Sequence, residues 1–181
     1  MKESSFPTIK TDRLILRRFE LTDAADVQRM AGDKDVALNT LNMPFPYLDG
    51  MAEEWILSLE NGFKDQKSIV YAICLKSTGF LIGAIGLTLN LKYRMAELGY
   101  WVGREYWNNG YCTEAVKAVI TFAFDNYKLH KVYANYFGNN PASGRVMTKA
   151  GMQYEGTLKS HMWHHDQYKD LIFYSIFNPD I

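Results

Sequence analysis

Hydrophobic positions along the chain follow two different spacings. Short runs rich in β-branched and aromatic residues predict strands at 13–19, 69–75, 80–89, 96–102, 131–137 and 170–177, with a further strand near Met152. Apolar residues spaced three and four apart predict helices over 22–30, from Asp49 to about Phe63, after Thr113, and between Asn140 and Gly151. The order of these elements predicts a mixed α+β fold with about seven strands and about four helices.

Three of the predicted strands follow one another through short connections. The 69–75 and 80–89 strands are joined by a turn at 76–79, and the polar segment 90–94 leads to the 96–102 strand. Connections this short join antiparallel neighbours, whereas parallel strands need long crossovers. We therefore expect an antiparallel meander within a mostly antiparallel central sheet. The helix before it carries an apolar stripe that we expect to face the sheet, at Met51, Trp55, Leu59 and Phe63.

The bulk properties of the chain limit its partners. No linker, repeat or low-complexity tract divides the 181 residues, so we expect one domain over 1–181. The 20 basic residues balance 20 acidic ones, so no global positive field attracts nucleic acid. The apolar runs are shorter than a membrane span, residues 1–7 contain no signal segment, and two cysteines, Cys74 and Cys112, fit a reducing compartment. We expect a cytoplasmic protein without nucleic-acid or membrane partners.

One junction between a strand and a helix carries most of the chemical information. A polar turn with glycine follows the 96–102 strand, and the amphipathic helix is expected to begin at Thr113. The first N–H groups of a helix have no intrahelical partner and lie at the positive end of its dipole, so this turn suits a diphosphate. The turn lacks the lysine of nucleoside-triphosphate loops and the three glycines of dinucleotide loops. The candidate binding residues are Trp107, Asn108, Asn109, Gly110, Tyr111, Cys112 and Thr113.

The turn resembles the pyrophosphate loop of the GNAT acetyltransferases. That loop has an Arg or Gln, two residues, a Gly, one residue and a Gly or Ala, and Trp107, Gly110 and Cys112 occupy this frame. The sequence is most similar to the ribosomal-protein N-acetyltransferase branch (RimJ/RimL-type), in which Trp-Gly-Lys-Gly-Tyr-Ala-Thr-Glu-Ala is usual. Asn108 and Cys112 depart from that run. Asn tolerates the positive φ that glycine usually supplies, whereas Cys adds bulk beside the expected phosphates.

Three further blocks extend the resemblance over about residues 11–177. Residues 11–17 are similar to a Thr-x-Arg-Leu-x-Leu-Arg opening strand. Residues 140–156 are similar to an Asn-x-x-Ser, Lys-x-Gly-Phe and Glu-Gly pattern, with Met152 in place of Phe. Residues 170–175 resemble the Asp and Tyr-Ser of the last strand. The resemblance implies a GNAT fold, with a central sheet that is splayed at the cofactor site.

The resemblance also implies acetyl-CoA as the cosubstrate, without a metal. In the superfamily, free backbone amides of the splayed strand hold the pantetheine arm and the acetyl oxygen, which assigns this role to Tyr100, Trp101 and Val102. Backbone amides fixed in a strand need little reorganisation, so they suit the stabilisation of an oxyanion. Asn140 and Ser143 would contact the pantetheine chain from the following helix.

The candidate general base is Glu97, a carboxylate inside the otherwise apolar 96–102 strand and near the place where the superfamily often has a glutamate. It would accept a proton from an ammonium through water. The alternative is a solvated Glu97 that pairs with Lys92 or Arg94.

The usual catalytic acid of the superfamily is absent. Many members have a tyrosine seven residues after the Asn140 position, but this chain has Met147 there. Ser143 is the catalytic candidate that could hydrogen-bond the departing sulfur, and Tyr111 or solvent are alternative proton donors.

Other polar side chains have more than one interpretation. A dense group near the C-terminus could bind a metal, although we favour a loop or edge strand that lines the acceptor cleft. Its members are His161, His164, His165 and Asp166, and Trp163 and Tyr168 would belong to the same wall. The candidate cations for the 3′-phosphate of the coenzyme are Lys117, Arg145 and Lys149.

Together these features predict an acetyl-CoA-dependent N-acetyltransferase that moves an acetyl group to a primary amine by direct attack on the thioester. By resemblance, the acceptor is the α-amino group of a protein N-terminus, as in ribosomal-protein acetylation. Two alternatives stay open, namely acetylation of a small amine such as an antibiotic or a polyamine, and a non-catalytic module that binds acyl-CoA. Formation of a homodimer is also left open.

Overall fold

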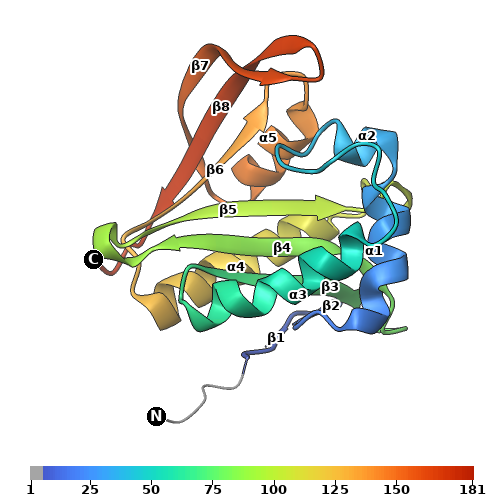
Figure 1. The fold of residues 1–181 in the computed structure, drawn as a ribbon. Coiled ribbons are helices and arrows are strands. Elements are labelled where there is room, and N and C mark those ends of the chain that lie inside the picture. The colour runs from blue at the N-terminus through green and yellow to red at the C-terminus, as the bar shows by residue number, and fades with distance from the viewer. Residues whose placement is uncertain (1–5) are drawn as a thin grey trace.

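Eight strands form one sheet in the order β1-β2-β3-β4-β5-β6-β8-β7 (Figure 1). The structure is a computed structural model that describes residues 6–181, so residues 1–5 of the expected domain lie outside the described part. Within residues 6–181 all neighbouring strands are antiparallel except β5 and β6. The strands are β1 (Ile9–Lys10), β2 (Leu14–Arg17), β3 (Ser68–Leu75), β4 (Leu81–Asn90), β5 (Met95–Val102), β6 (Lys131–Phe137), β7 (Gln153–His164) and β8 (Gln167–Phe177).

Helices cover both faces of this sheet, with α1 and α3 in front of β3 and β4 in Figure 1 and α4 behind them. The helices are α1 (Ala24–Ala31), α2 (Lys34–Ala37), α3 (Met51–Lys64), α4 (Tyr111–Tyr127) and α5 (Pro141–Lys149). Three short 3₁₀ turns, η1 (Leu21–Asp23), η2 (Leu91–Tyr93) and η3 (Arg104–Tyr106), lie in the connections. Because side chains alternate along a strand, Ile69 and Tyr71 of β3 pack toward α4 whereas Ala72 and Cys74 pack toward α1 and α3.

The predicted α+β class and antiparallel meander are confirmed, with differences at short elements. The structure adds the two-residue β1 and the four-residue α2, which are too short to give a hydrophobic period. Helix α4 begins at Tyr111, two residues before the expected start. The predicted stripe of α3 is only partly buried, because the helix is rotated so that Ala52 and Ile56 are its buried positions.

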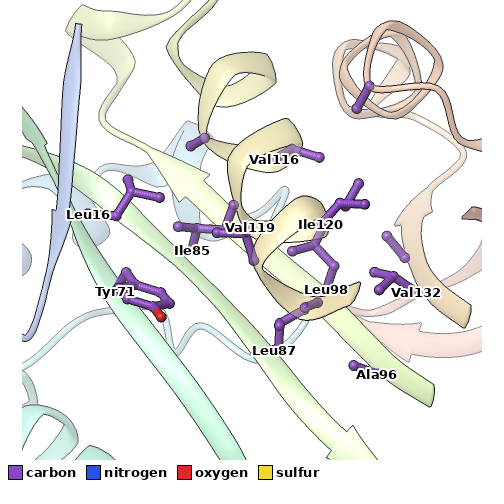
Figure 2. Close-up of a cluster of buried hydrophobic side chains, with 14 of the residues drawn as sticks. Leu16, Tyr71, Ile85, Leu87, Ala96, Leu98, Val116, Val119, Ile120 and Val132 are labelled. Atoms are coloured by element: carbon purple, nitrogen blue, oxygen red, sulfur yellow. The ribbon is translucent and has the colours of Figure 1, made fainter. Parts of the chain in front are cut away.

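The core on the α4 side joins this helix to the middle of the sheet. Figure 2 shows Val116, Val119 and Ile120 of α4 among side chains of the neighbouring strands. Leu16 of β2 and Leu98 of β5 belong to the same cluster, and Leu16 has no exposed surface. The apolar residues predicted for one face of this helix are therefore its buried residues. Their packing against the strands holds the first turn of α4 in place against the sheet.

Strands β5 and β6 separate after a short paired stretch. Their parallel pairing ends at Glu97 and Tyr133, although β5 continues to Val102 and β6 to Phe137. Figure 1 shows β6 rising away from β5 toward α5. The expected splay is present, and within residues 6–181 the edge of β5 that faces β6 has no strand partner from Leu98 onward. No helix within residues 6–181 combines the length and the apolar character needed to cross a bilayer.

Leu16 provides a test of the α4-side core. We expect Leu16→Ala to lower the free energy of unfolding by about 2–5 kcal/mol, because it removes a fully buried side chain and leaves a cavity. Leu57→Ala on α3 is the matched control, since Leu57 is 58% exposed, and its effect should stay within about 0.5 kcal/mol. Urea unfolding measures both values. Equal losses in the two variants would contradict this packing.

Candidate active site

A cavity of about 710 Å³ occupies the place where β5 and β6 separate. Its volume is in the range of small-molecule sites in proteins. Its wall includes the start of α4, the 139–149 segment, the 39–44 segment after α2, and residues on both faces of β5. Cofactor and acceptor could therefore enter from different sides of the sheet and meet at the splay.

Most of the predicted catalytic and coenzyme-binding residues line this cavity. Among the residues assigned to catalysis, the diphosphate and the pantetheine arm, Asn109 alone does not line the cavity within the described part of the chain. The predicted residues that do line it are Glu97, Tyr100, Trp101, Val102, Trp107, Asn108, Gly110, Tyr111, Cys112, Thr113, Asn140 and Ser143.

Two left-handed residues bend the chain before α4. Gly110 is the N-cap residue of α4 with φ of 78°, and Asn108 has φ of 61°. The left-handed region suits glycine, and asparagine is one of the few other residues that enter it readily. Asn108 therefore adopts the positive φ that glycine usually supplies at this position, as the sequence predicted.

The carbonyl groups of this turn are hydrogen-bonded to donors of the protein. Nδ2 of Asn109 donates to the carbonyl oxygens of Tyr106 at 3.2 Å and Trp107 at 2.9 Å. The indole Nε1 of Trp107 donates to the Val102 carbonyl at 2.7 Å, and Arg13 Nη1 donates to the Asn109 carbonyl at 3.0 Å. In a trans peptide the C=O and the following N–H point in opposite directions. Fixing these carbonyls therefore also fixes the direction of the following N–H groups.

The backbone N–H groups of residues 108–113 donate no hydrogen bond within residues 6–181. The first bonded amide is that of Glu114, which donates to the Gly110 carbonyl at 3.1 Å. Free donors at the positive end of a 17-residue helix are suited to an anion. Phosphate binding at this junction stays a prediction, and the free N–H groups are compatible with it.

The backbone of β5 offers further donors toward the gap. The Gly103 N–H donates to the Ile82 carbonyl at 2.9 Å, which extends the antiparallel ladder between β4 and β5. Because hydrogen bonding alternates along such a ladder, the N–H of Trp101 points to β4 whereas those of Tyr100 and Val102 point to the gap. Trp101 lines the cavity, but its backbone amide belongs to the ladder with β4.

Glu97 lies at the last paired position of β5 and β6 and is half-buried. Its Oε1 accepts a hydrogen bond from Asn135 Nδ2 at 2.8 Å, and its Oε2 accepts one from the Tyr133 hydroxyl at 3.4 Å. The alternative pairing with Arg94 is not formed, since that guanidinium donates to the Lys128 carbonyl. Neutral donors thus hold the Glu97 carboxylate in the cavity wall.

Sequence reasoning missed the two residues that hold Glu97. Tyr133 and Asn135 lie on β6, more than 35 residues away along the chain. Their spacing of two places them on one face of the strand, but only the parallel register with β5 shows that they face Glu97.

Ser143 and Tyr100 connect α5 to β5 inside the cavity. The Tyr100 hydroxyl lies 2.8 Å from Ser143 Oγ and donates to the Ser143 carbonyl at 3.2 Å. Burial raises the pKa of the Tyr100 phenol above its usual range, so the group stays protonated.

Asn140 Oδ1 accepts from the Ser143 N–H at 3.3 Å and caps α5. Met147 is buried in the core, so the usual acid position holds an apolar side chain.

Cys112 lines the cavity at the start of α4, and burial raises the pKa of its thiol to about 12. The thiol is therefore neutral at physiological pH. Arg145 and Lys149 line the cavity as well, whereas Lys117 does not.

The histidine-rich segment lies elsewhere. It forms the end of the β7–β8 hairpin, where His164 packs on Phe137 at 4.5 Å and Trp163 packs on Tyr168 at 4.9 Å between ring centroids. No residue of 161–168 lines the cavity, so the expectation that this segment forms its wall is wrong. The lining includes instead the segment after α2 with Tyr47 and Trp55. Within residues 6–181 no group of three or more His, Cys, Asp or Glu side chains could hold a metal ion.

Known proteins share this sequence pattern and fold. Residues 13–153 match the family model described as "Acetyltransferase (GNAT) domain". The uncharacterized N-acetyltransferase YoaA of Bacillus subtilis (strain 168) is 32% identical over 180 residues, which cover 96% of this chain and 98% of the relative. The ribosomal protein uS5-alanine N-acetyltransferase of Escherichia coli (strain K12) is 29% identical over 89 residues, which cover 49% of this chain and 46% of the relative.

Among solved structures, the RimL ribosomal L7/L12 α-N-protein acetyltransferase in complex with coenzyme A has a TM-score of 0.87 at 15% identity, with 94% of this chain and 98% of that chain covered. This similarity confirms the expected fold. Together, the matched domain and the relative that spans nearly the whole chain show that the protein belongs to the GNAT acetyltransferase family and is an N-acetyltransferase that uses acetyl-CoA.

Proposed function

We propose that this N-acetyltransferase modifies the α-amino group of a protein N-terminus. The observation that carries the proposal is the single cavity that joins the free amides before α4 to the Glu97 carboxylate across the splayed sheet. One relative is named for the acetylation of a ribosomal-protein alanine, and a peptide-like acceptor fits the chemistry of the acceptor side.

In the proposed complex, the diphosphate of acetyl-CoA binds the N–H groups of residues 108–113. The residues assigned to this turn are Trp107, Asn108, Asn109, Gly110, Tyr111, Cys112 and Thr113. Trp107 and Asn109 act by holding the turn, because their side chains bind backbone carbonyls. The remaining members line the cavity and offer the amides, so the diphosphate would meet several donors at once.

The rest of the coenzyme would follow the gap between β5 and β6. The free N–H groups of Tyr100 and Val102 would bind the pantetheine arm and the acetyl oxygen, and Trp101 would add its side chain to the wall. Asn140 and Ser143 would flank the pantetheine from α5. Donors fixed in a strand favour the charge that develops on the acetyl oxygen.

Glu97 is the proposed general base. It would remove the ammonium proton through a water molecule, and the free amine would then form a C–N bond with the acetyl carbon as the C–S bond breaks. The nitrogen of the new amide would lose its second proton to solvent. The departing thiolate would accept a hydrogen bond from the Ser143 hydroxyl and take up a proton from solvent, which balances that loss. The hydrogen bonds from Asn135 and Tyr133 keep the carboxylate oriented for this role.

The acceptor side favours an acceptor with a single charge near the reacting amine. Among the residues of 6–181 that line the cavity Glu97 is the only Asp or Glu, so a second ammonium of a polyamine has no carboxylate partner among them. The Asn42 amide and the side-chain oxygens of Asn39 and Thr40 are neutral polar groups that suit a peptide backbone. Asn39 Nδ2 and the Thr40 hydroxyl already donate to the carbonyls of Asp35 and Val36. A peptide N-terminus therefore fits better than a polyamine.

Glu97→Gln tests the general base. We expect kcat to fall about 100-fold or more, because proton removal from the ammonium is lost. The affinity for coenzyme A should not change, since the diphosphate site lies on the turn before α4. Steady-state kinetics and calorimetric titration measure the two quantities, with Glu54→Gln on the exposed side of α3 as control. Full turnover by the Gln variant at every pH would remove Glu97 from the mechanism.

Thiol release with a panel of acceptors tests the substrate class. We expect release with peptides that have a free N-terminus and none with the same peptides blocked at the N-terminus, even when they contain lysine. Spermidine and aminoglycoside amines should react more slowly than the free peptides. Faster reaction with spermidine would support the small-amine alternative, and binding of coenzyme A without turnover on any amine would support a non-catalytic module.

A further inference from the structure

We propose that Arg13 and Glu114 are a positioning pair that sets the direction of the amides in the phosphate loop, defined as residues 107–113, and so determines the affinity for the coenzyme. The inference rests on the proposed role of this loop in binding the diphosphate. Neither residue lines the cavity, so the pair would act through the loop rather than by touching the coenzyme.

Glu114 ties the first turn of α4 to the beginning of the sheet. Its Oε1 accepts from Thr11 Oγ1 at 2.6 Å and from the Arg13 backbone N–H at 2.9 Å, and its Oε2 accepts from Arg13 Nε at 2.7 Å. The partners lie about one hundred residues apart in the sequence. Two blocks that the sequence analysis treated separately thus form one network.

Arg13 extends this network onto the loop itself. While its Nε is bound to Glu114, its Nη1 donates to the Asn109 carbonyl at 3.0 Å, and its guanidinium carbon lies 4.7 Å from the Tyr111 ring centroid. A planar guanidinium can bind two acceptors in fixed directions. Arg13 therefore connects Glu114 rigidly to the loop.

The contact between Arg13 and the Asn109 carbonyl determines the direction of the Gly110 N–H. The carbonyl of Asn109 and the N–H of Gly110 belong to the same planar trans peptide and point in opposite directions. Because Arg13 holds the carbonyl on the side of β2, the Gly110 N–H points the other way. Gly110 lines the cavity whereas Asn109 does not. A flip of this peptide would place a carbonyl oxygen where the diphosphate is expected.

The charge of Glu114 also needs compensation. Desolvation raises the pKa of Glu114, but the hydrogen bonds from Thr11 and from the backbone and guanidinium of Arg13 outweigh it and hold the pKa below its usual range. An ionised carboxylate in the first turn would repel a diphosphate if it were unpaired. Arg13 neutralises it, so the electrostatic potential of the loop stays favourable to an anion.

Removing the positive charge of Arg13 and, separately, the negative charge of Glu114 tests whether the pair positions the loop or whether Arg13 only attracts the diphosphate. We expect both Arg13→Met and Glu114→Gln to raise the Kd of coenzyme A about tenfold, which is the scale of one lost charge-assisted hydrogen bond. The Kd of the double variant should be about the same as that of the weaker-binding single variant, because both changes release the same peptide. If Arg13 acted only as a positive charge near the phosphates, Glu114→Gln would instead strengthen binding, and that result would overturn the proposal.

Further measurements exclude a general loss of structure. Arg18→Met is the matched control, since Arg18 forms an exposed ion pair with Glu60 at 3.3 Å and does not line the cavity, and its Kd for coenzyme A should stay within about twofold.

Binding of acetyl-pantetheine, which lacks the diphosphate, should be the same in wild type and variants. The kcat at saturating acetyl-CoA and the KM for the amine should also stay unchanged. Arg13→Lys keeps the charge but cannot bridge both acceptors, so it should weaken coenzyme A binding as well.

Gly110→Val distinguishes failure of this inference from failure of the loop assignment. A β-branched residue is strained at φ of 78°, so this variant should bind coenzyme A more weakly if the loop holds the diphosphate. Wild-type affinity of Gly110→Val would overturn the loop assignment and this inference together. Weak binding by Gly110→Val with wild-type affinity of Arg13→Met and Glu114→Gln would overturn the positioning pair alone.

Discussion

The hydrogen bonds that hold the backbone carbonyls before α4 are the constraint on which the site depends. Planar peptides couple each carbonyl to the N–H that follows it, so holding the carbonyl oxygens of Trp107 and Asn109 directs the next amides. The donors to these two carbonyls are the side chains of Asn109 and Arg13, which do not line the cavity. The phosphate loop thereby presents a row of N–H groups without any lysine or arginine of its own.

The separation of β5 and β6 opens the gap that the cavity occupies beside these N–H groups. The two strands pair only as far as Glu97 and Tyr133, and the same divergence that opens the gap leaves the amides of Tyr100 and Val102 free. The cavity passes through the sheet at this point. In the proposed mechanism a thioester on the α4 side meets an amine beside Glu97 through this opening, which a continuous sheet would prevent.

Local patterns in the sequence predicted the elements and the turn, because spacing, capping residues and Gly110 act over a few residues. Asn108 in the left-handed region and the buried face of α4 are examples. Contacts across the sheet could not be predicted in this way. The donors to Glu97 depend on the parallel register of β6, and the histidine segment was placed in the acceptor wall because nothing local showed how far the β7–β8 hairpin extends. Self-association and a cytoplasmic location stay predictions.

A crystal structure of the complex with coenzyme A would show whether the phosphate loop holds the diphosphate. We expect the diphosphate oxygens to lie within hydrogen-bond distance of the N–H groups between Asn108 and Thr113, with the Asn109 carbonyl still bound to Arg13. A diphosphate bound elsewhere, or an Asn109 carbonyl turned into the cavity, would contradict it.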